Sequence, residues 1–177
     1  PGIGYGGSCF PKDVKALIKT AEQNGYDMRV LRAVEEVNEI QKSALFEKLL
    51  KLFNNKLKDK TIAIWGLAFK PETDAMREAP ALDKLRQAGC KIRVYDPAAM
   101  EECKRRIGDS VYYAHDMYDA VLDTDVLMLV TEWKEFRLPS WPVIKKTMTQ
   151  PIVLDGRNIY DKKEMEEQGF IYRCIGK

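Results

Sequence analysis

The sequence predicts an α/β protein in which a long helix precedes a Rossmann-like, doubly wound parallel sheet. Two patterns lead to this fold class. From about residue 57 onward, short apolar runs alternate with amphipathic stretches, and continuous apolar strands separated by helices are typical of a parallel sheet covered on both faces. Before it, apolar residues recur at helical spacing over roughly 25 positions without Gly or Pro. With 177 residues, of which 45% are hydrophobic, the chain can fill such a core.

The first region, residues 1–27, combines a glycine-rich loop with a short helix. The loop reads GIGYGGSCFPKD, and Pro11 suits the first turn of a helix. The apolar residues that follow lie at helical spacing and stop before Asn24 and Gly25; they are Val14, Leu17, Ile18 and Ala21.

The second region, residues 28–56, is predicted to be one long helix from about Met28 to Phe53. About 25 helical residues extend ~37 Å, which is more than most small domains need. The helix therefore either links two lobes or packs against another copy of the chain, or it is an ordinary core helix of unusual length.

The third region, residues 57–177, is the predicted sheet domain. Its expected strands are Thr61 to Trp65, Lys91 to Tyr95, Val111 to Tyr113, Val126 to Val130, Ile152 to Leu154 and Phe170 to Arg173. Its expected helices are Ala79 to Ala88, Met100 to Ile107, Met117 to Leu122, Trp141 to Met148 and Lys162 to Gln168. Ligands of such sheets bind beyond the carboxyl ends of the strands. The loops WGLAFKPETDAMREAP, TEWKEF and DGRNIYD lie there, and no GxGxxG follows the first strand.

Composition excludes several classes of function. The 29 basic and 27 acidic residues give a net charge of only +2, which argues against a nucleic-acid-binding protein. Four scattered cysteines and one histidine offer no zinc-ligand spacing, and they suit a reducing, cytoplasmic setting. We expect no membrane span, since no stretch of ~18 apolar residues occurs. Because the chain opens on PGIGYGG without an initiator Met, we expect it to be a fragment that lacks an N-terminal partner domain.

Cys9 is the strongest catalytic candidate. The motif would place it at a helix N-terminus, where unpaired amides and the nearby Lys12 favour the thiolate, a nucleophile toward carbonyl carbon. Asp13 follows one helical turn later and could orient a water molecule or a cation. The alternative is a buried structural cysteine beside a tight turn. Cys90, Cys103 and Cys174 are expected only to pack, and Trp133 and Phe136 to be aromatic core.

Three cations could form an anion site. Lys70 and Arg77 flank the start of the helix after the first strand, and Arg157 leaves the carboxyl end of a later strand, so all three can converge over the ligand edge of the sheet. Arginine binds phosphate bidentately and lysine as a compact charge, while Phe69 offers a stacking surface. A diphosphate that carries a base and a sugar fits this set. The alternative for either arginine is a structural salt bridge.

Four motifs in this order, GYGGSCFPKD, GLAFKPETDAMREAP, VYDP and DGRNIYD, resemble the UDP-glucose 6-dehydrogenase family of nucleotide-sugar dehydrogenases over essentially the whole chain. Ser8 stands where N-acetylmannosamine relatives carry His. GDP-mannose relatives remain the near alternative. Ala75 departs from the Asp usual in the family, and the helix after Pro80 looks about one turn short.

The resemblance implies oxidation of the sugar C6 alcohol of UDP-glucose to a carboxylate with two NAD, through a thiohemiacetal and a thioester on Cys9. It implies that Asp13 assists a catalytic Lys that lies upstream, together with an N-terminal NAD-binding domain, and that the long helix builds a homodimer. It assigns substrate contacts to Tyr5, Gly6, Phe10, Phe69, Lys70 and Arg157, and NAD contacts to Lys12 and Arg77.

Two other classes of function stay open. One is a nucleotide-sugar-binding module without chemistry of its own. The other is a cysteine-nucleophile acyl-transfer enzyme, which requires a base near Cys9, and the only histidine, His115, is far away in the sequence.

Overall fold

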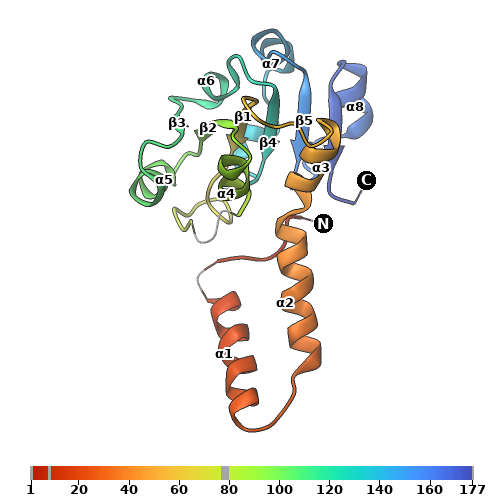
Figure 1. Cartoon of the computed structure of the whole chain (residues 1–177). Helices are drawn as coiled ribbons and strands as arrows, with labels where there is room; N and C mark the ends of the chain where they lie inside the picture. Colours follow the sequence, from red (N-terminus) through yellow and green to blue (C-terminus); the bar gives the residue numbers. More distant parts are fainter. Residues whose placement is uncertain (1, 8, 77–79, 177) are drawn as a thin grey trace.

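The computed structural model describes residues 2–7, 9–76 and 80–176 of the chain. They form a sheet domain and, projecting from it, a pair of helices joined at their far end (Figure 1). We call this pair, α1 (Phe10–Gln23) and α2 (Arg29–Lys42), the helical hairpin.

The sheet has six strands in the order β3-β2-β1-β4-β5-β6, and every neighbouring pair is parallel. This is the strand order of a doubly wound Rossmann fold, so the predicted fold class is confirmed. The strands are β1 (Thr61–Trp65), β2 (Lys91–Tyr95), β3 (Tyr112–Tyr113), β4 (Val126–Leu129), β5 (Ile152–Asp155) and β6 (Ile171–Cys174).

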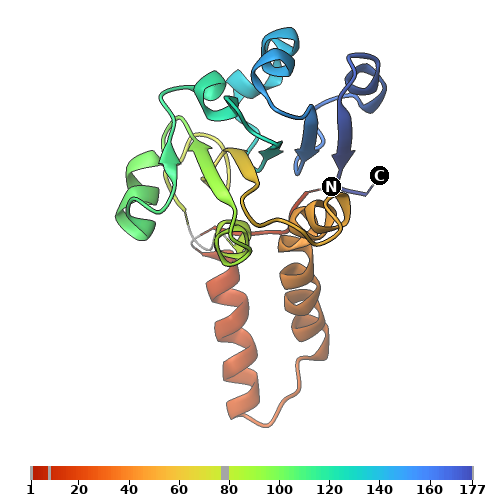
Figure 2. The same ribbon diagram turned by 45° about the horizontal axis from the view of Figure 1, so that its top comes forward.

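Helices cover both faces of the sheet (Figure 2). One buried cluster contains side chains of α3 (Ala44–Leu52), α4 (Pro80–Gln87) and α5 (Met100–Ile107). The other contains side chains of α6 (Met117–Val121), the 3₁₀ helix η1 (Lys134–Arg137), α7 (Trp141–Thr147) and α8 (Lys162–Glu167). The sheet therefore has a hydrophobic core on each side.

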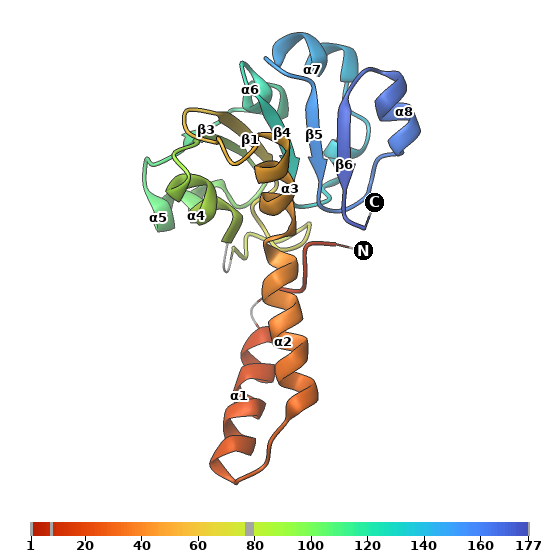
Figure 3. The same ribbon diagram turned by 45° about the vertical axis from the view of Figure 1, so that its right-hand side comes forward.

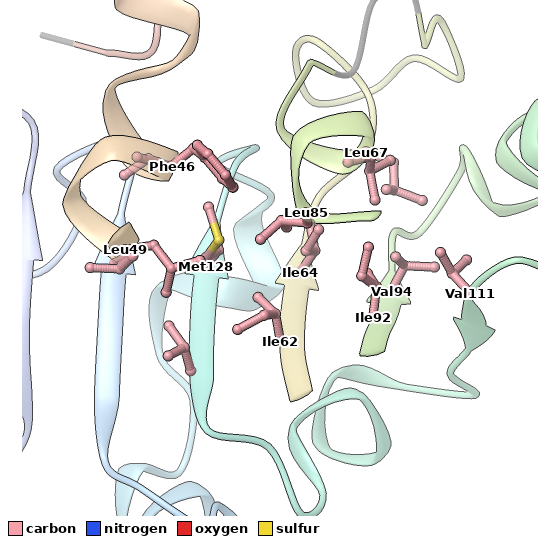
Figure 4. Close-up of a cluster of buried hydrophobic side chains, with 14 of the residues drawn as sticks. Phe46, Leu49, Ile62, Ile64, Leu67, Leu85, Ile92, Val94, Val111 and Met128 are labelled. Carbon is pink, nitrogen blue, oxygen red and sulfur yellow. The ribbon is translucent and has the colours of Figure 1, made fainter. Parts of the chain in front are cut away.

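Alternation along the strands supplies both cores. In β1, Ile62 and Ile64 face α3 and α4, whereas Ala63 and Trp65 face the opposite layer. Figure 4 shows the first core, with Phe46 and Leu49 of α3 packed near Met128 of β4. Burying an aliphatic or aromatic side chain of this size contributes about 1.5–3 kcal/mol, so the two clusters are the main hydrophobic contribution to the stability of this domain.

Most predicted boundaries agree with the structure to within one residue. Val111, Val130 and Phe170 lie just outside their strands, and η1 was not predicted. Phe136 is fully buried and stacks on Trp65 at 5.0 Å between ring centroids, which confirms its expected place in the core. The predicted start of a helix at Ala79 lies outside the described residues.

The prediction of one unbroken helix from Met28 to Phe53 is wrong, because the chain divides at Ser43 into α2 and α3. The Ser43 N–H bonds to Ile40 O at 3.1 Å, three residues back instead of four. The Ser43 hydroxyl also lies 3.5 Å from Glu39 O, an arrangement that bends helices. Beyond the break, Leu45, Phe46 and Leu49 turn into the core of the sheet.

The helical hairpin buries little. Of its side chains, Pro11 and Val14 on α1 and Asn38 on α2 are buried. A row of exposed apolar residues, here called the apolar stripe, runs along α2; it comprises Val30, Val34, Val37 and Ile40, which are 40–77% exposed. Figure 3 shows the hairpin extending away from the sheet, so nothing in the sheet domain covers the stripe along most of α2. Among the described residues, no helix has the length and apolar character needed to cross a membrane.

Candidate functional site

A cavity of about 620 Å³ lies at the carboxyl ends of β1, β4 and β5, between the sheet and the base of the helical hairpin. Its volume is that of a small-molecule site. Neighbouring strands β1 and β4 lead to opposite layers, so the cavity opens at the topological switch point where doubly wound sheets bind ligands. The lining residues are Ile3, Gly4, Tyr5, Gly6, Gly7, Pro11, Lys12, Lys15, Lys42, Ile64, Gly66, Leu67, Ala68, Phe69, Ala81, Leu82, Arg106, Val130 and Arg157.

The charged residues among the described lining are all cations. They are Lys12, Lys15, Lys42, Arg106 and Arg157. Each pairs with a carboxylate outside the lining: Asp13 at 3.5 Å, Glu35 at 3.9 Å, Glu39 at 2.7 Å, Glu102 at 2.6 Å and Glu132 at 3.6 Å, respectively. Because these carboxylates lie outside the lining, the wall of the cavity presents one sign of charge, which suits a phosphorylated ligand.

Arg157 is positioned by the buried Asp155 at the end of β5. The carboxylate accepts the backbone N–H groups of Arg157, Asn158, Ile159 and Tyr160 and the hydroxyl of Tyr172 at 2.8–3.2 Å. Arg157 Nη2 donates to Phe69 O at 3.3 Å. Its Nε is buried and has no hydrogen-bond partner among the described residues. Arg157 thus forms a structural ion pair with Glu132 and keeps one N–H donor, at Nε, that a ligand could use.

Asp96, at the end of β2, organises the loop after β1 in the same way. Asp96 Oδ2 accepts the N–H groups of Leu67 at 2.7 Å and Ala68 at 3.1 Å, and also Trp133 Nε1 at 3.1 Å. Its Oδ1 accepts the N–H groups of Ala98 and Ala99. In dinucleotide-binding domains the acid of this region binds ribose hydroxyls. Here the loop uses both oxygens, so this sheet does not present that ribose site.

Phe69 joins the loop after β1 to the glycine-rich segment. A Cβ on Gly7, whose φ is +97°, would lie 2.9 Å from the Phe69 ring. Only glycine allows this approach. The Lys70 ammonium lies 5.5 Å from the Phe69 ring centroid, is exposed, and is not part of the cavity lining.

Cys9 occupies the N-cap of α1 and is exposed. Its carbonyl accepts the Asp13 N–H at 2.9 Å. In the chain Cys9 lies between Gly7 and Pro11, which line the cavity, although Cys9 itself is not part of the lining. The other thiols differ: Cys103 and Cys174 are buried in the two cores, and burial raises the pKa of the half-buried Cys90 to about 11. Their predicted packing role is confirmed for Cys103 and Cys174.

Tyr5 ties the glycine-rich segment to α2. Its N–H donates to Asn38 Oδ1 at 2.7 Å, its carbonyl accepts Asn38 Nδ2 at 3.1 Å, and its hydroxyl donates to Glu35. Burial, together with the Glu35 carboxylate, raises the pKa of Tyr5 to about 12, so the phenol stays protonated at neutral pH. The Phe10 ring packs edge-on against Tyr5 at 5.0 Å.

The predicted residues are only partly brought together. Tyr5, Gly6, Lys12, Phe69 and Arg157 share one cavity. Phe10 and Asp13 are exposed outside its lining, and Arg77 lies outside the described residues.

Sequence reasoning missed Lys15, Lys42 and Arg106, because charged residues on a predicted helix are normally assigned to its solvent-exposed face. It also missed the roles of Asp96, Asp155 and Asn38. The sequence does carry a signal for the two acids, since each follows an apolar strand and precedes a loop motif, in VYDP and in VLDGRN.

Two family models match the chain. One is described as the UDP-glucose/GDP-mannose dehydrogenase family, UDP binding domain, and matches residues 63–162. The other is the central domain of the same family and matches residues 1–40. The two matches thus fall on the sheet domain and on the glycine-rich loop with most of the helical hairpin.

Individual relatives agree with the family models. The chain is 50% identical to UDP-glucose 6-dehydrogenase of Pseudomonas aeruginosa, over 99% of this chain and 41% of the relative. It is 42% identical to UDP-glucose 6-dehydrogenase TuaD of Bacillus subtilis, over 99% of this chain and 39% of the relative. A solved UDP-glucose dehydrogenase from Pyrobaculum islandicum superposes with a TM-score of 0.80 at 33% identity, covering 97% of this chain and 38% of that one. The chain thus spans about two fifths of the length of these relatives.

Proposed function

The chain belongs to the UDP-glucose/GDP-mannose dehydrogenase family, and we propose that it forms the cysteine loop and the UDP-sugar-binding domain of an NAD-dependent UDP-glucose 6-dehydrogenase. The cavity carries this proposal. Its lining joins five cations to the glycine-rich loop that contains Cys9, and it lies at the ligand edge of a domain matched by a UDP-binding family model.

The proposed ligand follows from the chemistry of the lining. Arg157 and the lysines supply charge for a diphosphate, and Phe69 supplies an apolar surface beside them. Tyr5 and Gly6, next to the cysteine loop, would contact the sugar. Lys70 and Phe10, which are exposed in this structure, would contact the substrate at its edges. Specificity for UDP-glucose over GDP-mannose rests on the relatives named UDP-glucose 6-dehydrogenase.

NAD would accept the two hydrides that this oxidation releases. The described residues fit a contact to the cofactor at Lys12, which lines the cavity and has a side chain 71% exposed, and Arg77 would add a second. They do not fit a main NAD site on this sheet, because no GxGxxG follows β1 and both oxygens of Asp96 already accept backbone N–H groups, with Trp133 as a further donor. We propose that a separate NAD-binding domain, for which the length of the relatives leaves room, completes the active site.

Cys9 would act once the C6 alcohol has lost a hydride and a proton to become an aldehyde. The sulfur attacks the aldehyde carbon and the former carbonyl oxygen takes up a proton, which gives a thiohemiacetal. Loss of a second hydride from that carbon, with the hydroxyl proton, leaves a thioester. Water then adds to the thioester carbon, the C–S bond breaks, the thiolate is restored and the carboxylate is released. Asp13, beside Lys12 at the start of α1, would assist a catalytic lysine supplied from outside these residues.

The three regions take separate roles in this proposal. Residues 1–27 carry the nucleophile, residues 28–56 carry the contact between subunits, and residues 57–177 bind the UDP-sugar. The apolar stripe of α2 supports a homodimer, since apolar rows of this kind mark protein interfaces. We place the enzyme in the cytoplasm, where thiols remain reduced.

The test is a steady-state assay of the complete enzyme with NAD and a panel of UDP- and GDP-sugars, run beside Cys9→Ser. We expect NADH formation with UDP-glucose, and at least a thousandfold loss of steady turnover in Cys9→Ser, since loss of a covalent nucleophile typically costs 10³ or more. Cys90→Ser is the matched control and should keep its activity. Preference for a GDP-sugar would redirect the proposal, and unaltered turnover by Cys9→Ser would refute it.

A further inference from the structure

We propose that Asn38 of α2 is a positioning residue that sets the place of the Cys9 thiol, and that its loss impairs the aldehyde-to-carboxylate half of the reaction more than the first oxidation. This inference rests on the proposed function. It concerns a side chain that is not part of the cavity lining and that acts through Tyr5, which is.

Asn38 bonds to both backbone polar groups of Tyr5. It accepts the Tyr5 N–H at 2.7 Å and donates to the Tyr5 carbonyl at 3.1 Å. Together these bonds imitate the pairing of a neighbouring β-strand and hold the peptide groups on both sides of the Tyr5 Cα. A single hydrogen bond would hold only one of these two peptide groups.

The contact is buried and closely fitted. Asn38 is only 4% exposed, although it lies on a helix whose neighbouring residues face solvent. A Cβ on Gly4, whose φ is +89°, would lie 2.6 Å from Asn38 Oδ1. The loop can therefore approach Asn38 only because glycine occupies this position. A buried amide in such a fit is costly unless both of its groups are bonded, and here both are.

Other residues of α2 support the same attachment. Gln41, one turn beyond Asn38, donates from Nε2 to Gly2 O at 2.6 Å, and Glu35, one turn before it, accepts the Tyr5 hydroxyl. Of these three, only Asn38 holds the backbone of Tyr5. Helix α2 thus positions the glycine-rich loop through hydrogen bonds. The loop is bonded to it at Tyr5, immediately before Gly6 and Gly7.

The placement of the thiol depends on this attachment because Gly6 and Gly7 lie between Tyr5 and Cys9 in the chain. Gly6 and Gly7 gain the most conformational freedom when a neighbouring anchor is lost. The far side of Cys9 is fixed by α1 and the buried Pro11. Release of Tyr5 would let one end of the segment move, and a displacement of about 1 Å at a reacting group can cost 10²-fold in rate.

The two half-reactions respond differently to such a displacement. The first oxidation removes a hydride from the alcohol and needs no bond to sulfur. The second needs the sulfur within bonding distance of the aldehyde carbon. A misplaced Cys9 should therefore slow the second oxidation selectively and let the aldehyde accumulate, whereas general loss of structure would weaken both half-reactions together.

The experiment uses Asn38→Leu in the complete enzyme, because leucine has nearly the shape of asparagine but neither hydrogen-bonding group. Rates with UDP-glucose and NAD are measured with hydroxylamine present to trap the aldehyde. We expect a fall in kcat of about tenfold to 10²-fold, a change in KM of less than about threefold, and trapped aldehyde that the wild type does not release. Glu36→Gln, at an exposed site on the same helix, is the matched control.

Two further variants keep the test decisive if Asn38→Leu fails to fold. Asn38→Asp keeps the acceptor for the Tyr5 N–H and loses the donor, so its defect should be intermediate. Gly4→Ala pushes against Asn38 from the side of the loop and should also release aldehyde. The role of Asn38 would be overturned if folded variants released no more aldehyde per turnover than the wild type. It would also be overturned if both half-reactions slowed equally. Intact turnover by Cys9→Ser would instead overturn the proposed function.

Discussion

The sheet domain and the helical hairpin differ in how much of their apolar surface is buried. The sheet places an apolar layer against helices on each face, and its largest core side chains, such as Trp65 and Leu49, are fully buried. The hairpin leaves its apolar stripe exposed and buries only three side chains, one of which, Asn38, is polar. The sheet domain therefore buries its apolar side chains within itself, whereas the hairpin is attached by polar contacts at its base and leaves its apolar stripe exposed.

Buried polar groups also differ between the two regions. In the sheet domain, Asp96 and Asp155 each fix the loop that follows a strand, inside a core that is already packed. In the hairpin, Asn38 fixes a loop where little packing assists it. Loss of the former should therefore appear mainly as lost stability, and loss of the latter mainly as lost precision in the active site.

The largest effect on stability is expected for Asp155→Ala. This change leaves the Tyr172 hydroxyl and several backbone N–H groups without an acceptor in a buried site, which should lower the free energy of unfolding by about 4 kcal/mol. Urea denaturation measures it. Asp161→Ala is the control, since the exposed Asp161 also accepts two backbone N–H groups, as the N-cap of α8. Its loss should cost only about 1 kcal/mol, and equal costs would contradict the role of burial.

A second pair compares apolar residues of the two regions directly. Leu49→Ala removes a fully buried side chain between α3 and the sheet and should destabilise the chain by about 3 kcal/mol. Leu17→Ala makes the same chemical change at a site on α1 that is 50% exposed, and it should cost less than about 0.5 kcal/mol. Thermal unfolding of both variants at one low protein concentration, chosen so that the proposed dimer is dissociated, tests the contrast. A large loss from Leu17→Ala would show that the hairpin has a core of its own.

The third change tests the proposed partner surface. Val37→Glu puts a charge in the middle of the apolar stripe, at a side chain that is 64% exposed. We expect the dimer to dissociate at least about tenfold more readily, while unfolding of the sheet domain stays unchanged. Sedimentation velocity over a range of concentrations measures the association, with Glu36→Lys as a control on the same helix. An unaltered dimer would place the interface elsewhere.

The sequence predicted the sheet domain well because each strand and helix there obeys a local pattern. Apolar runs such as TIAIW mark strands, and their order in the chain is enough to place the carboxyl ends on one edge. The break at Ser43 was missed because the apolar spacing continues through it. The break combines the local hydrogen bonds of Ser43 with the packing of Phe46 and Leu49 against sheet residues far along the sequence, and the second of these has no local signal.

Site residues within a sequence motif could be predicted. Site residues that act only through a tertiary contact could not. Tyr5, Phe69 and Arg157 lie in recognisable loops, and the cavity unites them. Asn38 lies in the middle of a charged helix, where an asparagine reads as solvent-exposed. Its partner is 33 residues away in the sequence, so no local pattern reveals the pair.

The break at Ser43 lies beside the sheet, so it is the pivot about which the hairpin would rotate relative to the sheet. At 1.5 Å per helical residue, Asn38 lies about 8 Å along α2 from Ser43, whereas Val30 lies about 20 Å away. A rotation at the pivot therefore displaces the outer end of the apolar stripe more than twice as far as it displaces the Tyr5 attachment. A shift of about 1 Å at the Tyr5 attachment, a size that matters at a reacting group, would thus accompany a shift of about 2.6 Å at the outer end of the stripe.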